Sequence, residues 1–125
     1  MEVLKDDERS IVHVMDDGNV HKQFKHIDEE DTLKRFNNEV NVLRFLEEKG
    51  CDFVPRLIDV NEDELSIVMT HCGGGVNRLS NKRFQEIFKK LETYGIRHHD
   101  MRFPNITYKN RKFFVIDFEK SSFIT

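Results

Sequence analysis

The sequence lacks the long apolar runs that membrane association requires. No stretch approaches the roughly 20 apolar residues that a membrane-spanning helix needs. The first ten residues, MEVLKDDERS, also lack the apolar core of a secretory signal peptide. We therefore expect no membrane partner and a cytoplasmic location.

Strong charge of one sign and a cysteine framework are missing as well. Charged residues make up 34% of the chain, but their signs are mixed and the net charge is only −3. Because no block of lysine and arginine stands alone, we expect no nucleic-acid partner. The context of the two cysteines, Cys51 and Cys72, favours reduced thiols over a disulfide.

The composition is that of one folded domain. The chain has 125 residues, which is long enough for a single hydrophobic core, and 38% of them are hydrophobic. Tryptophan is absent, so eleven phenylalanines supply much of the bulk of that core. No internal repeat or low-complexity tract is present.

A β-hairpin is predicted near the start of the chain. Residues 10–15 and 20–25 have strand-like patterns, and the DDGN sequence between them is typical of a turn. In the second strand Lys22 shares a face with Val20 and Phe24, because side chains alternate along a strand. Lys22 is therefore either a surface residue on an edge strand or a residue with an acidic partner.

A long helix is predicted next, with one carboxylate on its apolar face. The acidic residues 28–31 suit a helix N-terminus, residues 32–49 carry apolar side chains at spacings of three and four, and Gly50 suits the C-terminal end. Glu39 falls on the apolar stripe, where an unpaired carboxylate is costly to bury. We expect Lys22 to be its partner; the alternative is that Glu39 flanks the stripe and faces solvent.

Two more strands and a second helix are predicted in the middle of the chain. Residues 56–60 and 65–69 are typical of strands, and the three glycines at 73–75 form the best internal boundary. Ser80 or Asn81 is expected to cap the second helix. The apolar face of that helix consists of Phe84, Ile87, Phe88 and Leu91.

The most informative stretch lies between residues 95 and 121. It contains the pattern H-x-D-x-x-x-x-N from His98 to Asn105, followed by a predicted hairpin that ends in D-F-E at Asp117. These residues resemble the catalytic loop, H-R-D-x-x-x-x-N, and the metal-binding D-F-G of the protein-kinase superfamily. His98 is expected to play the family's structural role of holding the loop against the Asp117 strand.

The resemblance implies an α+β fold of two lobes. The N-lobe, residues 1–72, would be an antiparallel sheet with the family's helix C, and residues 73–75 would be the hinge. Residues 76–125 would form a reduced C-lobe made of a helix and the catalytic hairpin. The chain thus resembles a minimal, C-terminally truncated eukaryotic-like kinase.

The resemblance also implies the roles of two residues in the N-lobe. Val20-His21-Lys22 is similar to the family's A-x-K, and the residues around Glu39 are similar to helix C. Lys22 would therefore hold the phosphates of ATP, and Glu39 would orient Lys22.

Four residues of the C-lobe match the family's phosphoryl-transfer groups. Asp100 would accept the proton of the acceptor hydroxyl, and Arg102 would help neutralise the γ-phosphate. Asn105 and Asp117 would bind Mg²⁺, which neutralises charge on the phosphates. The cofactors implied are thus ATP and Mg²⁺.

Five further residues would surround the adenine if the resemblance holds. Val12 and Val20 would cover the base, and Met69 is similar to the residue that kinases place at the back of the pocket. Thr70 and Cys72, in the segment that resembles the hinge, would offer a backbone carbonyl and a backbone amide to the adenine edge.

Several departures from the family affect the functional expectation. The glycine-rich loop is replaced by Lys5-Asp6-Asp7-Glu8-Arg9-Ser10, whose acidic side chains would repel phosphates. His99 replaces the arginine of H-R-D, and Glu119 replaces the glycine of D-F-G, as in choline-kinase-like and other small-molecule kinases. The sequence ends six residues after Glu119, without the family's activation segment and later helices.

Two functions are consistent with these observations. The first is a Mg-ATP-dependent phosphotransferase that acts on a protein Ser/Thr or a small-molecule hydroxyl. The second is a pseudokinase that acts as a nucleotide-binding or protein-interaction module. A structural zinc site made of His98, His99, Asp100 and Cys72 is disfavoured, because adjacent histidines rarely converge on one ion.

The apolar face of the second helix suggests a protein partner. In a complete kinase this face packs against later helices that are absent from this sequence. Left open, its four large side chains would exceed the apolar area that a monomer usually exposes. We therefore expect a homodimer or a partner protein to bind through the C-lobe.

Overall fold

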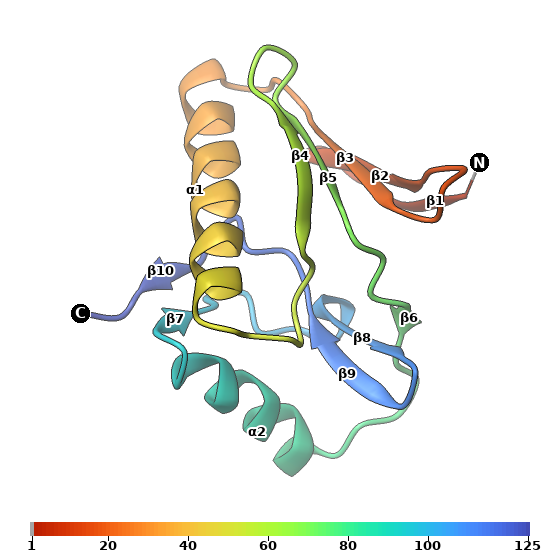
Figure 1. Cartoon of the computed structure of the whole chain (residues 1–125), viewed down its shortest axis with the longest axis vertical. Coiled ribbons are helices and arrows are strands. Elements are labelled where there is room, and N and C mark those ends of the chain that lie inside the picture. The colour runs from red at the N-terminus through yellow and green to blue at the C-terminus, as the bar shows by residue number, and fades with distance from the viewer. Residues whose placement is uncertain (1) are drawn as a thin grey trace.

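The computed structural model describes residues 2–125 and has an α+β fold. A five-stranded antiparallel sheet with the strand order β1-β2-β3-β5-β4 forms one part, and helix α1 runs beside it (Figure 1). The strands are β1 (Val3–Asp6), β2 (Ser10–Val14), β3 (Val20–Phe24), β4 (Leu57–Asn61) and β5 (Ser66–Met69). The hairpin and the two middle strands are therefore confirmed, whereas β1 was not predicted.

Helix α1 (Glu29–Glu48) begins and ends at the signals in the sequence. The side chain of Asp28 caps its N-terminus by accepting hydrogen bonds from the backbone N–H groups of Glu30 and Asp31. At the other end Gly50 has a φ of 76°, the left-handed conformation that commonly terminates a helix. The helix buries Glu39 together with its apolar stripe.

The rest of the chain packs below the sheet as viewed in Figure 1. Helix α2 (Asn81–Glu92), capped by Ser80, lies beside a three-stranded sheet with the order β6-β8-β9. A short strand pair and a 3₁₀ turn complete the fold. These elements are β6 (Gly74–Gly75), β7 (Ile96–Arg97), η1 (Phe103–Asn105), β8 (Ile106–Lys109), β9 (Lys112–Val115) and β10 (Ser122–Phe123), with β7 paired to β10.

The glycine segment is held by backbone pairing. Strand β6 pairs with β8, so that Gly74 lies opposite Tyr108 and Gly75 opposite Thr107. Gly73 has a φ of 89°, and a Cβ atom placed on it would lie 2.1 Å from the backbone oxygen of Tyr108. Glycine is therefore required at position 73 by both conformation and space.

The expectation that the apolar face of α2 lies open is wrong. Ile87, Phe88 and Leu91 are only 6%, 1% and 0% exposed, because they belong to the hydrophobic core. Phe84 is half-buried and stacks edge-to-face on Phe88 and Phe103. The physical reason for the expected association through this face is thus removed, because the chain's own residues cover it.

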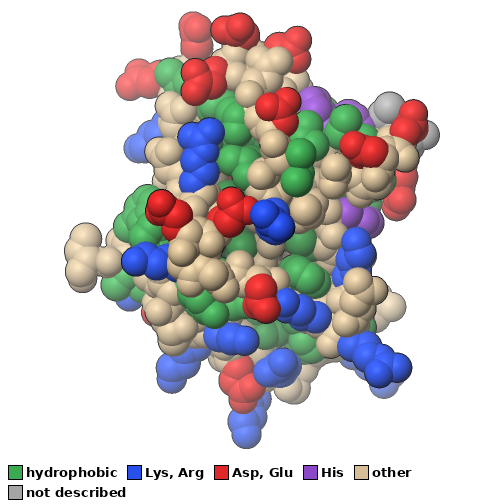
Figure 2. All heavy atoms as spheres, in the orientation of Figure 1, with side chains coloured by type: hydrophobic (Ala, Val, Ile, Leu, Met, Phe, Trp, Pro, Cys, Tyr) green, Lys and Arg blue, Asp and Glu red, His purple; other side chains and the backbone are tan. Residues whose placement is uncertain are grey.

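Charged side chains are unevenly distributed over the visible surface. Asp and Glu side chains gather over the start of α1 and the β4–β5 turn, and Lys and Arg gather toward the end that holds α2 (Figure 2). Among residues 2–125, no helix is long and apolar enough to cross a membrane.

Candidate functional site

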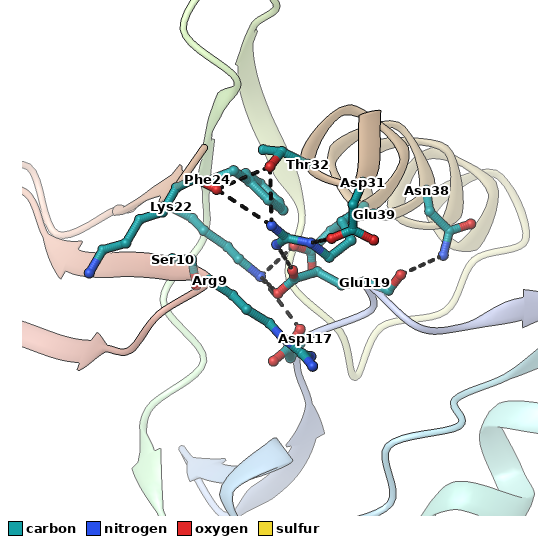
Figure 3. A network of polar contacts seen from close by, with 12 residues as sticks. Arg9, Ser10, Lys22, Phe24, Asp31, Thr32, Asn38, Glu39, Asp117 and Glu119 are labelled. Carbon is teal, nitrogen blue, oxygen red and sulfur yellow. Dashed lines mark hydrogen bonds and ion pairs between the residues drawn. The ribbon is translucent and has the colours of Figure 1, made fainter. Parts of the chain in front are cut away.

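Lys22 is the centre of a buried cluster of charges. Its side chain comes from the middle of β3, and the residue is only 2% exposed. The Nζ atom lies 2.6 Å from Oε1 of Glu39, 2.8 Å from Oε2 of Glu119 and 3.5 Å from Oδ1 of Asp117 (Figure 3). The predicted pair of Lys22 and Glu39 is confirmed, and the alternatives that leave either side chain in solvent are wrong.

The Lys22–Glu39 pair fixes α1 against the segment that follows β9. While Oε1 of Glu39 faces Lys22, its Oε2 accepts a hydrogen bond of 2.8 Å from the backbone N–H of Phe118. Burial raises the pKa of Glu39, although the nearby Lys22 charge opposes this. Burial would lower the pKa of Lys22, but the surrounding carboxylates outweigh it and the pKa is raised, so Lys22 stays protonated.

Glu119 has a structural role that the sequence did not indicate. Its second carboxylate oxygen, Oε1, lies 2.6 Å from Nη1 of Arg35, one helical turn before Glu39 on α1. Asn38 supports the same segment by donating to the backbone carbonyls of Phe118, Glu119 and Ser121. The signal that could have identified Arg35 is its i, i+4 spacing from Glu39, which places both on one helix face.

Asp117 has a second cation partner from the start of the chain. Nζ of Lys5, on β1, lies 2.9 Å from Oδ2 of Asp117. Burial would raise the pKa of Asp117, but the charges of Lys22 and Lys5 outweigh it and hold the pKa far below its usual range. The φ of Asp117 is 65°, a conformation that costs a non-glycine residue energy and often marks a functional position.

His98 connects the loop that holds Asp100 to the end of β9. Its Nδ1 accepts a hydrogen bond from the backbone N–H of Asp100 at 3.1 Å, so its Nε2 carries the proton and donates to the carbonyl of Ile116 at 2.9 Å. Burial lowers the pKa of His98, which agrees with this neutral form. The role expected for His98 matches these contacts.

Asp100 is held by Arg102 and Asn105, which lie two and five residues after it in the sequence. The side-chain nitrogen of Asn105 donates to the backbone oxygen of Asp100 at 2.8 Å and to Oδ2 at 3.1 Å. Nε of Arg102 lies 3.0 Å from Oδ1 of the same carboxylate. The amide oxygen of Asn105 is therefore the atom of that side chain that remains for a cation.

Two adjoining cavities lie beside these groups. The first, of about 220 Å³, is lined by all five residues expected around the adenine, together with Lys22, Asn105 and Asp117. The second, of about 360 Å³, is polar and is lined by Asp100, Glu119 and the turn after β1. Lys5, Arg102 and Asp117 line both cavities. Neither set of lining residues includes Glu39, which lies behind Lys22.

The acidic turn after β1 is already neutralised in part. Asp6 forms an ion pair of 2.6 Å with Lys25, and Asp7 accepts hydrogen bonds from the backbone N–H groups of Arg9 and Ser10. Two of the three carboxylates expected to repel phosphates thus have partners of their own.

The described residues contain one group of acidic side chains that could hold a metal ion. Oxygens of Glu39, Asp117 and Glu119 lie within 4.8 Å of one another, but the Lys22 ammonium contacts all three carboxylates. Asn105 and Asp117 both line the first cavity and offer the oxygen donors that a hard divalent cation prefers, but each Asp117 oxygen also faces a lysine.

The residues weighed for zinc do not form a metal site within 2–125. Nε2 of His99 contacts the hydroxyl of Ser122 at 2.7 Å, and His98 is occupied by backbone groups. Burial raises the pKa of Cys72 to about 11, which keeps this thiol protonated and a poor ligand.

No known protein-family model matches the chain, and no curated protein matches it. These two comparisons therefore assign neither a family nor a function. The site has to be interpreted from the chemistry of its own residues.

Proposed function

We propose that this protein is a kinase-like phosphotransferase that binds Mg-ATP and transfers the γ-phosphate to a hydroxyl acceptor. In this proposal the five-stranded sheet and α1 are the N-lobe of a protein-kinase-like fold, within residues 1–72. Residues 73–75 are the hinge, and residues 76–125 are a reduced C-lobe.

One observation carries the proposal. Lys22, Glu39 and Asp117 come from three distant parts of the sequence, and their side chains meet at 2.6 and 3.5 Å around the Lys22 ammonium. They do so beside a cavity lined by Val12, Val20 and the other residues that the kinase motifs assign to the nucleotide. A chance match of short motifs gives no reason for these groups to converge.

The segment after β5 has backbone groups free for an adenine edge. The carbonyl of Cys72 is occupied by the Thr107 hydroxyl at 2.6 Å, and the N–H of Thr70 donates to the carbonyl of Arg56. The two groups expected to pair with the base are the Cys72 N–H and the Thr70 carbonyl, which the Cys72 thiol contacts at 3.9 Å.

The proposed chemistry assigns a task to each polar group. Asp100 accepts the proton of the acceptor hydroxyl; the acceptor oxygen forms a bond to the γ-phosphorus while the bond from phosphorus to the β,γ-bridging oxygen breaks. Lys22 and Arg102 hold phosphate oxygens. Asn105 and Asp117 would hold Mg²⁺, which supplies positive charge to the phosphates when bound.

The test combines binding and turnover. Calorimetry should show ATP binding that weakens strongly when EDTA removes Mg²⁺, and equal affinity in both conditions would refute the magnesium assignment. Phosphate release or autophosphorylation should occur with Mg-ATP and be lost in Asp100→Ala, whose nucleotide affinity should stay within a few-fold of wild type.

A nucleotide-binding module without catalysis is the second candidate. The observation that favours it is that Asp100 and Asp117 are both held in ion pairs, with Arg102 and Lys5 respectively. Such pairs reduce the availability of a base and of a metal ligand. Mg-ATP binding without turnover, under conditions where Asp100→Ala changes nothing, would decide for this candidate.

A further inference from the structure

Lys5 and Lys22 lie on the same row of the large sheet. Lys5 is the cross-strand partner of Val12, and Val12 is the partner of Lys22. Side chains at matched positions of neighbouring strands point to one face. The two lysines therefore project toward the cavity from β1 and β3, with Val12 between them.

Both lysines contact the carboxylate of Asp117. Nζ of Lys5 lies 2.9 Å from Oδ2 of Asp117, and Nζ of Lys22 lies 3.5 Å from Oδ1. Each oxygen of Asp117 thus faces an ammonium group. A divalent cation that takes Asp117 as a ligand has to displace at least one of them, because like charges repel.

Lys5 is the ammonium group that can move. Lys22 is held by two carboxylates at 2.6 and 2.8 Å and is almost fully buried. Nζ of Lys5 has only Asp117 and, at 3.4 Å, the carboxylate of Asp7, and its side chain is 34% exposed. A long, partly exposed side chain can swing to a new partner without disturbing the core.

The cluster is electrically balanced before any ligand arrives. Glu39, Asp117 and Glu119 are offset by Lys5, Lys22 and Arg35, each of which contacts at least one of these carboxylates. Lys5 and Arg35 also pair with Asp7 and Asp31, but these two side chains are 43% and 62% exposed, so water screens their charge. A balanced cluster has little net attraction for a free cation. When a cation arrives bound to phosphate, the phosphate supplies the compensating negative charge and a new partner for Lys5.

The Lys5–Asp117 ion pair also lies where the two cavities adjoin, since both residues line both of them. A ligand whose apolar part fills the first cavity and whose phosphates extend toward the second therefore passes Lys5.

We propose that Lys5 is a phosphate-binding side chain that serves as the counter-ion of Asp117 when no ligand is bound. It takes the place of the backbone contacts that a glycine-rich turn would supply between β1 and β2. When Mg-ATP binds, Asp117 exchanges Lys5 for the cation and Lys5 exchanges Asp117 for a phosphate oxygen. This inference rests on the proposed nucleotide-binding function and adds a residue and an exchange that the kinase motifs do not contain.

The test compares three probes on the wild-type chain and on Lys5→Met. The probes are adenosine, MnCl₂ without nucleotide, and Mg-ATP, each followed by calorimetry. Lys5→Met should bind Mg-ATP about 10- to 100-fold more weakly, which is the size expected for one lost charged hydrogen bond. It should bind adenosine equally well, and it should bind Mn²⁺ alone more tightly than wild type because Asp117 has lost a competing cation.

Two further variants separate this role from a general loss of charge or folding. Lys25→Met removes the neighbouring ammonium that pairs with Asp6 and lines neither cavity, so all three affinities should stay unchanged. Lys5→Arg keeps the charge and should retain most of the Mg-ATP affinity. Circular dichroism and thermal unfolding establish that each variant is folded.

The outcomes distinguish this inference from the function on which it rests. If wild type binds neither adenosine nor Mg-ATP, the proposed function fails and the role of Lys5 fails with it. If wild type binds Mg-ATP and Lys5→Met binds it equally tightly, only the role of Lys5 is overturned. Weaker Mn²⁺ binding in Lys5→Met would overturn the exchange, because it would make Lys5 a support for the metal site.

Discussion

The charge cluster predicts that the effect of Glu39→Gln on stability differs in sign between the wild-type chain and the Lys22→Met variant. Glu39→Gln removes a carboxylate that faces Lys22 at 2.6 Å and also accepts the N–H of Phe118. In the wild-type chain we expect it to destabilise the fold. In Lys22→Met we expect the same substitution to be neutral or stabilising, because Glu39 is then a buried charge without a cation.

The magnitudes follow from the contacts. Lys22→Met leaves a fully buried Glu39 carboxylate unpaired, which costs about 3–5 kcal/mol. Glu39→Gln alone costs about 1–3 kcal/mol, because Lys22 keeps Glu119 and the amide oxygen can still accept from Phe118. The coupling between the two positions should therefore reach about 2–3 kcal/mol, the upper part of the range for neighbouring residues.

Urea unfolding of wild type, both single variants and the double variant measures this coupling. The solvent-exposed pair of Glu47 and Arg56 is the control; its atoms are 2.9 Å apart, but the side chains are 46% and 73% exposed, so its coupling should stay below about 1 kcal/mol. A Glu39→Gln effect of the same sign and size in both backgrounds would refute the reasoning. It would mean that solvent reaches the cluster and screens the pair.

Three other predictions concern the elements around the site. Burial lowers the pKa of His98 below the 6.5 of the unfolded chain. The contribution of neutral His98 to folding stability is therefore complete above pH 6.5 and is lost as the pH falls. Between pH 7.5 and 5, the free energy of unfolding should fall less in His98→Gln than in wild type. Gly73→Ala should lower the free energy of unfolding by at least about 2 kcal/mol, whereas Gly74→Ala, whose Cβ meets no atom within 4 Å, should change it by less than about 0.5 kcal/mol. Ile87→Asp should destabilise the chain by about 3 kcal/mol or more in denaturant unfolding, and wild type should sediment as a monomer, because Ile87 is buried within the chain itself.

The secondary structure was largely predictable because its signals are local. Helix α1 has its acidic cap, its apolar periodicity and its terminal glycine within one continuous segment. The hairpin of β2 and β3 likewise has a turn sequence between two strand-like runs. Strand β1 was missed because Val3–Asp6 has only four residues, and three of them are exposed, so no alternation marks it.

The open face expected for α2 shows where local reasoning fails. Its amphipathic pattern predicted an apolar face, and that face exists. What covers it comes from other parts of the sequence: His98 packs edge-to-face on Phe88 and, on its other side, on Phe118. Sequence periodicity says that a face must be covered, but it does not say by what.

Some residues of the candidate site could be predicted from the sequence, and others could be found only in the structure. The Lys22–Glu39 pair was predictable because a carboxylate on an apolar helix face needs a cation, whereas the contact of Lys22 with Asp117 was not predicted. Lys5 and Arg35 match no motif, and Glu119 was noted only as the residue that replaces the glycine of D-F-G. The reason for their presence appears only when charges are counted inside the structure: the buried Glu39 and Glu119 and the partly buried Asp117 need three cations, and the motif supplies one.

The pairing of these six charges also holds the large sheet and α1 against the segment that follows β9. The six charges come from β1, β3, α1 and the segment after β9, so each ion pair connects elements that are distant in the sequence. Removing one charge leaves its partner unpaired at the junction, and the neighbouring elements can then separate to admit water. The position of Asp117 relative to the sheet is therefore set by electrostatic pairing as well as by packing. Any ligand that replaces Lys5 on Asp117 must supply the charge that Lys5 removes, and this is why we expect cation and phosphate to bind together.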